Sequence, residues 1–321
     1  MACAIRWYDD PQALRCLPPL FRLLALYYRS SAQSAMGEPP AARYWHHKAA
    51  RLIQRLGLRD TARVRLNGLR VDIDLLDARS TWVMDELLDP PPEARILQSL
   101  LGAGDTFLDI GANHGSYSLM AAPAVKEGRV LAFEPHPRLA ELLRGSFAAN
   151  RFRNAEVFDV ACADRNGEAT LYVPRTMSGI GGLYESFSGG NGRLRFNVPV
   201  RRLDDILAGQ TLPGTVVMKL DVEGSEMAVL RGARELIRKH RPLILLELNP
   251  ASARAAGYSV EDLLQFLRGC GYDHLAEPDE FPATTPLEAA DTMRQRNVFV
   301  ISAGTRRSTG LLRKSPQTVP S

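Results

Sequence analysis

The sequence predicts a doubly wound α/β domain over residues 95–303, preceded by a helical N-terminal extension. The 321 residues are 45% hydrophobic and 24% charged, a composition typical of a soluble globular protein. Short, continuous apolar runs alternate with helix-length intervals, which indicates a parallel sheet buried on both faces. The predicted strands are Thr106–Ile110, Arg129–Phe133, Ala155–Ala161, Thr215–Leu220, Leu243–Leu248, Tyr272–Ala276 and Asn297–Ile301.

Residues 1–62 are predicted to form a basic helical extension with a linker. Residues 13–28 are mostly apolar, and Arg15, Arg22 and the adjoining Arg29 are spaced by seven residues, which favours one amphipathic helix. We expect this helix to pack on the α/β domain or on a partner subunit; weak contact with a membrane surface is the alternative. Residues 31–42 have the composition of a linker, and Tyr44–Leu56 that of a second basic helix.

Residues 63–94 are predicted to form a small β-hairpin and a segment on the substrate side. Alternating apolar residues flank Asn67-Gly68, a pair that favours the tight turn of a two-residue hairpin. A helix is expected over Glu93–Leu101, because Gly102 follows it. Residues 304–321 contain four basic and no acidic residues, and we expect them to form a disordered basic tail.

The charge distribution argues against a nucleic-acid substrate. The net charge is +4, but residues 71–303 carry 24 basic and 32 acidic residues, a net charge of −8. A nucleic-acid-binding protein would carry its positive charge on the working domain, so we predict a small or neutral substrate and no nucleic acid. The oligomeric state is left open by the sequence.

The positions of the cysteines and the lengths of the apolar runs indicate the cellular compartment in which the protein is expected. Cys3, Cys16, Cys162 and Cys270 are far apart and form no CxxC pair, which excludes an obvious zinc site or disulfide framework. No apolar run is long enough to span a bilayer, and the N-terminus lacks the pattern of a secretory leader. We therefore expect a reducing, cytoplasmic location.

The strongest motif is a glycine-containing loop at the end of the first strand of this domain. An apolar strand ends at Asp109, and Gly111 and Gly115 allow the backbone to turn tightly and approach a ligand before the next helix. Glu134 ends the next strand, 23 residues beyond Gly111. A carboxylate there can accept hydrogen bonds from both ribose hydroxyls of an adenosine.

The loop differs from the dinucleotide fingerprint GxGxxG. Its pattern is Asp-x-Gly-x-x-x-Gly, which places the carboxylate of Asp109 just before the turn. That charge would repel a pyrophosphate and attract a cationic amino-acid group. The cofactor predicted by this charge pattern is S-adenosyl-L-methionine, which has an ammonium, a sulfonium and a ribose but no phosphate. NAD is disfavoured on the same ground.

Further charged residues are predicted to meet this loop at the same edge of the sheet. Asp164 follows the third strand, where it would accept a hydrogen bond from an adenine amino group or form an ordinary turn. Lys219, Asp221 and Glu223 follow the fourth strand, and Glu247 ends the fifth. So many charges at strand ends favour a functional site over a structural ion network, because the interior offers little solvation.

Four sequence blocks together resemble the FkbM family of S-adenosylmethionine-dependent methyltransferases. They are Leu-Asp-Ile-Gly-Ala-Asn-x-Gly-x-Tyr-Ser at 108–118, Ala-Phe-Glu-Pro-x-Pro at 132–137, Lys-Leu-Asp-Val-Glu-Gly-Ser-Glu at 219–226 and Leu-Glu-Leu-Asn at 246–249. The resemblance covers about residues 80–303. It implies a class I methyltransferase (Rossmann-like) fold with seven strands, and O-methylation of a hydroxyl on a sugar, polyketide or other small molecule.

The resemblance also implies roles for individual residues. The methionine part of the cofactor would be held by Asp109, Gly111, Asn113 and Gly115, the ribose by Glu134 and the adenine side by Asp164. Lys219, Asp221 and Glu223 would face the transferred methyl group and the acceptor. Either Asp221 or Glu223 would accept the hydroxyl proton, while Lys219 orients the acceptor oxygen or stabilises developing negative charge.

Several alternatives stay open. His114 and His136 are either alternative bases or exposed loop histidines. Asp221, Glu223 and Glu247 supply hard oxygen ligands that a metal could use, but no histidine or Asp-Asp-Asn cluster completes an obvious set, so metal dependence stays open and no metal ligand is assigned. The glycine-rich stretch Ser178–Gly192, which lies between predicted paired strands at Ala169–Val173 and Phe196–Val200, is either a lid or substrate loop or a disordered insertion.

Two other classes of function compete with a methyltransferase. One is a non-catalytic S-adenosylmethionine-binding or membrane-peripheral scaffold, which the basic N-terminal extension and acidic body suggest. The other is an NAD-dependent oxidoreductase, which the missing GxGxxG pattern disfavours. A comparison of the binding of S-adenosylmethionine with that of NAD separates the oxidoreductase from the other two, and turnover separates the enzyme from the scaffold.

Overall fold

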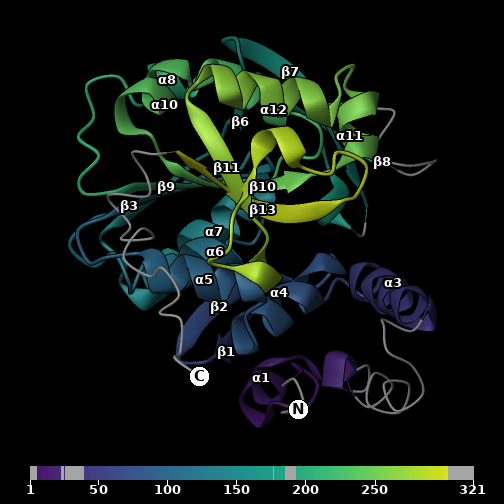
Figure 1. Cartoon of the computed structure of the whole chain (residues 1–321). Coiled ribbons are helices and arrows are strands. Elements are labelled where there is room, and N and C mark those ends of the chain that lie inside the picture. Colours follow the sequence, from purple (N-terminus) through teal and green to yellow (C-terminus); the bar gives the residue numbers. More distant parts are fainter. Residues whose placement is uncertain (1–5, 23–24, 26–39, 176, 185–192, 303–321) are drawn as a thin grey trace, which may run out of the picture.

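A mixed eight-stranded sheet occupies the centre of the computed structural model, which describes residues 6–22, 25, 40–175, 177–184 and 193–302 (Figure 1). The strands, in their order across the sheet, are β12 (Thr285–Pro286), β11 (Tyr272–Ala276), β13 (Arg296–Ser302), β10 (Leu243–Leu248), β9 (Val216–Leu220), β3 (Thr106–Ile110), β4 (Arg129–Phe133) and β5 (Ala155–Phe158). The five strands from β10 to β5 are parallel, and their carboxyl ends therefore lie at one edge of the sheet.

The structure confirms all seven predicted strands of this sheet and the doubly wound class I methyltransferase architecture, with two corrections. The two-residue strand β12 extends one edge. The sheet is also not wholly parallel, because β13 runs antiparallel to both of its neighbours, β10 and β11. The apolar side chains of β13 are buried on both faces of the sheet, a pattern typical of parallel interior strands, so the sequence did not indicate the direction of this strand.

Helices cover both faces of the sheet (Figure 1). One face carries α5 (Pro92–Leu100), α6 (Ser116–Ala121) and α7 (Pro137–Asn150), and the other carries α8 (Leu203–Ile206), α9 (Glu226–Gly232), α10 (Arg234–His240), α11 (Pro250–Ala255) and α12 (Val260–Gly269). Alternate strand residues enter the two apolar cores: Phe107 of β3 packs with the first group of helices and Leu108 with the second. This two-sided burial fixes the strand ends that form the site.

The predicted hairpin at residues 63–94 is confirmed. Strands β1 (Thr61–Leu66) and β2 (Leu69–Asp74) pair antiparallel, and both turn residues, Asn67 and Gly68, have positive φ. The hairpin packs on α7, where the backbone N–H of Asp72 donates to Oγ of Ser146 at 2.9 Å. A helix that was not predicted, α4 (Arg79–Leu88), follows the hairpin.

The N-terminal extension begins with a shorter helix than expected. Helix α1 (Pro11–Cys16) ends before Leu17, because Pro18 disfavours helical backbone at the residue that precedes it. Trp7 and Phe21, on either side of this helix, are buried in the same core as the hairpin, as predicted for a helix that packs on the domain. Helix α3 (Pro40–Arg55) corresponds to the second predicted basic helix.

A separate three-stranded sheet flanks the carboxyl edge of the main one. It contains β6 (Ala161–Cys162), β8 (Arg193–Arg201) and β7 (Gly167–Pro174), and β7 and β8 form the predicted antiparallel pair. The short 3-10 helices are η1 (Ser178–Ile180), η2 (Pro278–Glu280) and η3 (Leu287–Ala289).

Parts of four predicted segments lie outside the described residues: 23–24 and 26–28 of the first helix, 31–39 of the linker, 185–192 of the glycine-rich stretch, and the tail at 304–321. In the portion of the chain that the structure describes, none of the helices has the length and apolarity needed to cross a membrane.

Candidate functional site

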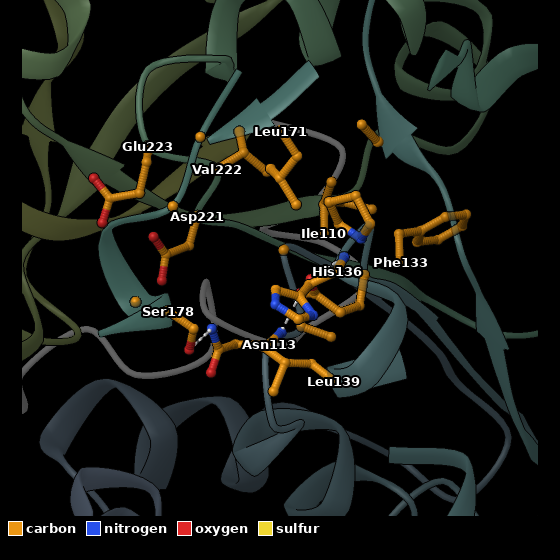
Figure 2. Close-up of a pocket in the computed structure, with 18 of the residues that line it drawn as sticks. Ile110, Asn113, Phe133, His136, Leu139, Leu171, Ser178, Asp221, Val222 and Glu223 are labelled. Carbon is orange, nitrogen blue, oxygen red and sulfur yellow. Dashed lines mark hydrogen bonds between the residues drawn. The ribbon is translucent and has the colours of Figure 1, made fainter. Parts of the chain in front are cut away.

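A cavity lies where the parallel strands β3, β4 and β9 end (Figure 2). Its walls come from the residues that directly follow these three strands, together with Val160–Cys162 and with Ser178–Leu183 beyond β7. Asp221 and Glu223 lie at one side of the cavity in Figure 2 and Phe133 at the other. Ligands of doubly wound sheets bind at this edge, so the cavity is the candidate functional site.

Glu134 is buried in the wall of this cavity and joins two of its loops. Its Oε2 accepts a hydrogen bond from the backbone N–H of Asn113, and its Oε1 accepts one from the backbone N–H of His136, both at 2.7 Å. Burial raises the pKa of Glu134 to about 7, although these two N–H groups lower it. Each carboxylate oxygen retains a lone pair for a further donor.

The two glycines of the predicted loop, Gly111 and Gly115, exclude a side chain for different structural reasons. Gly111 lines the cavity at φ +80°, and a Cβ there would lie 2.0 Å from the backbone oxygen of Asp221. Gly115 does not line the cavity; a Cβ there would collide with Leu143 of α7. Gly111 therefore brings the loop against the end of β9, whereas Gly115 allows α6 to pack against α7.

Asn113 lines the cavity between these glycines, and Asp109 lies beneath them. The Nδ2 of Asn113 donates to Oγ of Ser178 at 2.9 Å, which ties the loop to η1. Asp109 is fully buried, and its Oδ2 accepts from both N–H and Oγ of Ser118, at 3.1 and 2.7 Å. Asp109 thus holds the start of α6 and is not among the residues that line the cavity.

Lys219 is a buried cation at the end of β9. Its Nζ lies 3.1 Å from Oδ2 of Asp221 and 3.9 Å from Oδ1 of Asp109, and 5.0 Å above the ring of Tyr117. Burial would lower the pKa of Lys219, but the two carboxylates raise it above its ordinary value. The lysine therefore stays charged and holds Asp221 at the cavity wall.

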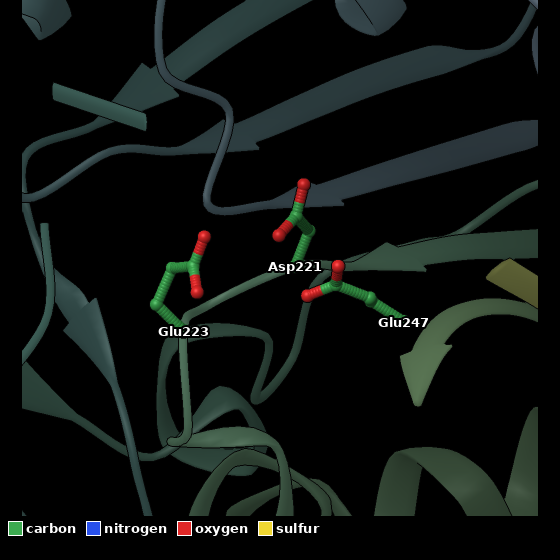
Figure 3. A group of neighbouring side chains, drawn as sticks. All are labelled: Asp221, Glu223 and Glu247. Carbon is green, nitrogen blue, oxygen red and sulfur yellow. The ribbon is translucent and has the colours of Figure 1, made fainter. Parts of the chain in front are cut away.

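Glu223 and Glu247 bring two further carboxyl groups to Asp221 (Figure 3). One ligand oxygen from each residue lies within 4.8 Å of the others, an arrangement that could hold a divalent cation. Burial, together with the charges of Asp221 and Glu247, raises the pKa of Glu223 to about 9. The carboxyl group of Glu223 therefore carries a proton at neutral pH.

Glu226, the third acid of this sequence block, has a structural role. Its Oε1 accepts from the backbone N–H groups of Val222 and Gly224, at 3.3 and 3.2 Å. Its Oε2 accepts from the Tyr258 hydroxyl at 2.7 Å. These three bonds fix the turn that places Asp221 and Glu223 in the cavity wall.

The two loop histidines are buried, contrary to the interpretation of exposed loop residues. His114 is fully buried, with Nδ1 2.7 Å from Oδ1 of Asn113. His136 lines the cavity, and its ring centre lies 4.5 Å from that of Phe196. Burial lowers the pKa of both histidines, so both are neutral at pH 7.

Asp164 lies apart from the other predicted site residues. It is exposed and borders a different surface depression, which it shares with Arg202, Asp204, Arg231, Arg234 and Glu235. The cavity wall after β5 is instead apolar and is made by Val160, Ala161 and Cys162. The structure thus brings Gly111, Asn113, Glu134, Lys219, Asp221 and Glu223 together and leaves Asp109, Gly115 and Asp164 outside the lining.

The polar residues of the lining to which the sequence analysis gave no role include Arg79 and Ser178. Arg79 begins α4, where an arginine normally points to solvent, and no motif marks it. Ser178 is in the glycine-rich stretch, whose described part does line the cavity, as a substrate loop would. The length and glycine content of that stretch were the available signal for Ser178.

Comparison with known proteins supplies the family. Residues 109–273, just over half of the chain, match the model of the methyltransferase FkbM domain. The chain belongs to the FkbM methyltransferase family. This confirms the resemblance drawn from the four sequence blocks and, with it, S-adenosylmethionine as the cofactor.

Two curated proteins and one solved structure are similar to part of this chain. The 2-O-methyltransferase NoeI of Sinorhizobium fredii is 31% identical over 164 residues, which cover 46% of this chain and 65% of NoeI. The 31-O-demethyl-FK506 methyltransferase FkbM of Streptomyces tacrolimicus is 24% identical over 222 residues, 60% of this chain and 82% of that protein. The methyltransferase FkbM of Methylobacillus flagellatus is 20% identical, covers 68% of this chain and 52% of its own, and has a TM-score of 0.37.

The residues of the cavity fit S-adenosylmethionine. The buried carboxylate of Glu134 has one free acceptor position on each oxygen for the ribose hydroxyls. The apolar wall at Val160–Cys162 suits an adenine ring, and Gly111 presents backbone without a side chain to the cavity. No pyrophosphate-binding GxGxxG loop is present in the sequence.

Proposed function

We propose that this FkbM-family chain is an S-adenosylmethionine-dependent O-methyltransferase that acts on a hydroxyl group of a small molecule or sugar. The observation that carries the proposal is that Asp221 and Glu223 line the same cavity as Glu134, beside a charged Lys219. Two relatives are named as O-methyltransferases, which supports a hydroxyl acceptor. An acceptor of this kind also suits the acidic charge of residues 71–303.

The cofactor supplies an electrophilic methyl group on its sulfonium. An acceptor oxygen would take that methyl group as the methyl–sulfur bond breaks and its electron pair passes to sulfur, and the hydroxyl proton would pass to a base of this chain. We assign that base to Asp221, whose Oδ2 lies 3.1 Å from Nζ of Lys219. Lys219 orients Asp221 and offsets the negative charge that develops on the acceptor oxygen.

Glu223 takes a different role in this proposal. Because its pKa is raised to about 9 by burial and by neighbouring carboxylates, its protonated carboxyl group is a hydrogen-bond donor at neutral pH. It would donate to an acceptor oxygen and hold the hydroxyl in line for transfer. Gly111, Asn113 and Glu134 hold the cofactor, and Asp109 and Gly115 act indirectly by positioning that loop.

Titration and turnover together test the proposal. S-adenosylmethionine, S-adenosylhomocysteine and NAD are titrated calorimetrically into the protein. The protein is then incubated with S-adenosylmethionine and with hydroxyl and amine acceptors from the sugar and polyketide classes. Binding of the two adenosyl ligands with transfer to a hydroxyl, identified by the O-methyl signal in NMR, is the expected result. Preference for NAD would indicate an oxidoreductase, and binding without transfer to any acceptor a scaffold; either would contradict the proposal.

A further inference from the structure

Arg79 is a cavity-lining residue that lies outside the family-matched region at residues 109–273. It is the first residue of α4, and its Nη2 lies 2.7 Å from Oε1 of Glu86. Its Cδ packs under Gly179, where a Cβ would lie only 2.9 Å away. The side chain is therefore held in place by an ion pair on one side and by the backbone of η1 on the other.

The second terminal nitrogen of this guanidinium, Nη1, has no partner among the described residues. Nη1 of Arg79 is buried and makes no hydrogen bond to any described residue. A buried N–H group without an acceptor is unfavourable, and such groups in folded proteins are commonly satisfied by a water or a ligand. The unpaired donor of a fixed cation in a cavity wall thus points to an anionic ligand.

An unpaired donor atom distinguishes Arg79 from the other cation of the cavity. Among the described residues, the lysine and arginine side chains that line the cavity are Arg79 and Lys219. Lys219 lies near two carboxylates, those of Asp221 and Asp109, which offset its charge. Arg79 also lies near carboxylates, those of Glu86, Asp221 and Asp77, but its Nη1 keeps an unpaired N–H. The carboxylate of Glu86 is shared, because its Oε2 also accepts from Oγ of Ser116 at 2.6 Å.

That shared contact places the guanidinium beside the cofactor loop. Ser116 directly follows Gly115 and begins α6, so Glu86 joins Arg79 to the end of the loop that starts at Gly111. In the proposed function this loop holds the amino-acid end of S-adenosylmethionine, which carries a carboxylate. A guanidinium presents paired N–H donors whose geometry matches a carboxylate.

We propose that Arg79 binds the carboxylate of the amino-acid end of S-adenosylmethionine, an inference that rests on the proposed function. Arg79 is then a cofactor-binding residue supplied by the segment before the family domain. Two other roles are conceivable for Arg79: it could bind an anionic group of the acceptor, or it could form a purely structural ion pair with Glu86. In either case the cofactor affinity would not depend on this side chain.

Two ligands that differ only at the amino-acid end test the inference. S-adenosylhomocysteine has that end, whereas 5′-methylthioadenosine keeps the adenosine and the thioether but lacks the carboxylate and ammonium. Both are titrated calorimetrically into the wild-type protein, Arg79→Ala and Arg79→Lys. We expect Arg79→Ala to weaken S-adenosylhomocysteine binding about 10–100-fold while methylthioadenosine binding stays within about 2-fold. Arg79→Lys should give an intermediate loss, because an ammonium keeps the charge without the paired donors.

The outcomes separate the inference from the proposed function. If the wild-type protein binds neither adenosyl ligand, the proposed function fails and the inference fails with it. If the wild type binds both ligands, the inference alone is wrong when Arg79→Ala weakens the two affinities equally or leaves both unchanged.

Methylthioadenosine binding and the melting temperature report whether each variant keeps a folded cavity, and Arg79→Lys gives the answer if the alanine variant does not fold. Arg95→Ala, which removes an exposed ion pair with Asp89, is the matched control and should leave both affinities unchanged.

Discussion

The carboxylate of Glu134 connects the end of β4 to the loop that follows β3, because its Oε2 accepts the backbone N–H of Asn113 at 2.7 Å. The same carboxylate accepts the N–H of His136 through Oε1. Glu134 therefore shapes the cavity and keeps an acceptor position on each oxygen for a ligand. Its replacement should affect binding more than folding, because the two backbone donors can bond to an amide oxygen or to water.

Glu134→Gln should weaken S-adenosylhomocysteine binding about 10–100-fold, because an amide has one acceptor oxygen where the carboxylate has two. In the wild type, the affinity should rise as the pH passes about 7, where this carboxyl group loses its proton, and the rise should be absent in Glu134→Gln. Calorimetric titration between pH 6 and 8 measures both effects. An unchanged affinity in the variant would show that Glu134 is structural only.

The strands of the main sheet and the residues at their carboxyl ends could be predicted from the sequence. All seven predicted strands formed because continuous apolar runs have few ways to be buried, and Glu134 and Asp221 follow from strand ends meeting at one edge. The direction of β13 and the burial of His114 depend on contacts between distant segments, which no local pattern encodes. Asp164 follows its strand like a ligand residue, but the chain turns it outward into solvent.

Asp221→Asn should lower kcat by about 10²–10⁴-fold, because an amide cannot accept the hydroxyl proton. The Kd for S-adenosylhomocysteine should stay within about 3-fold, since the predicted cofactor contacts lie at Gly111, Asn113 and Glu134. Steady-state turnover and calorimetry together separate the two effects. Asp279→Asn, at an exposed position of η2, serves as the control and should change neither value. Near-normal turnover by Asp221→Asn would exclude it as the base.

Glu223 should make the folded protein less stable as the pH rises. Its pKa is about 9 in the folded protein and near 4.5 in an unfolded chain, so the folded state holds an extra proton between these values. The stabilisation is complete below about pH 4.5 and is lost as the pH rises through about 9. Melting temperatures between pH 5 and 9 should therefore fall more steeply for the wild type than for Glu223→Gln.

Glu247→Gln is the matched comparison for this effect. Burial raises the pKa of Glu247 to about 7, so its share of the pH dependence should end near pH 7, whereas that of Glu223 continues to about pH 9. If the wild type and Glu223→Gln have the same dependence of melting temperature on pH, the carboxyl group of Glu223 titrates normally. Its assignment as a hydrogen-bond donor would then be wrong.

Methyl transfer should persist after metal removal. Asp221 is already paired with Lys219, Glu247 accepts a hydrogen bond from Gln295 at 2.8 Å, and Glu223 is protonated at neutral pH. The ammonium group of Lys219 therefore already offsets part of the charge of this cluster, and we expect turnover without an added cation. Turnover is measured after dialysis against EDTA, with and without added Mg²⁺. A loss that Mg²⁺ restores in the wild type would assign a cation to this cluster.

Gly111→Ala should lower stability and remove cofactor binding together. The φ of +80° disfavours any Cβ, and this Cβ would also lie 2.0 Å from the backbone oxygen of Asp221, which forces the loop away from β9. Gly257→Ala is the matched control, because Gly257 has φ +86° and nothing within 4 Å of its added Cβ. Thermal unfolding should show that Gly257→Ala lowers the free energy of unfolding by about 1 kcal/mol, from the backbone conformation alone.

The loss of unfolding free energy for Gly111→Ala should be larger by at least about 2 kcal/mol, because the collision is with backbone that cannot move without disturbing Asp221. Equal losses in the two variants, with S-adenosylhomocysteine binding retained by Gly111→Ala, would mean that the loop does not depend on this close approach.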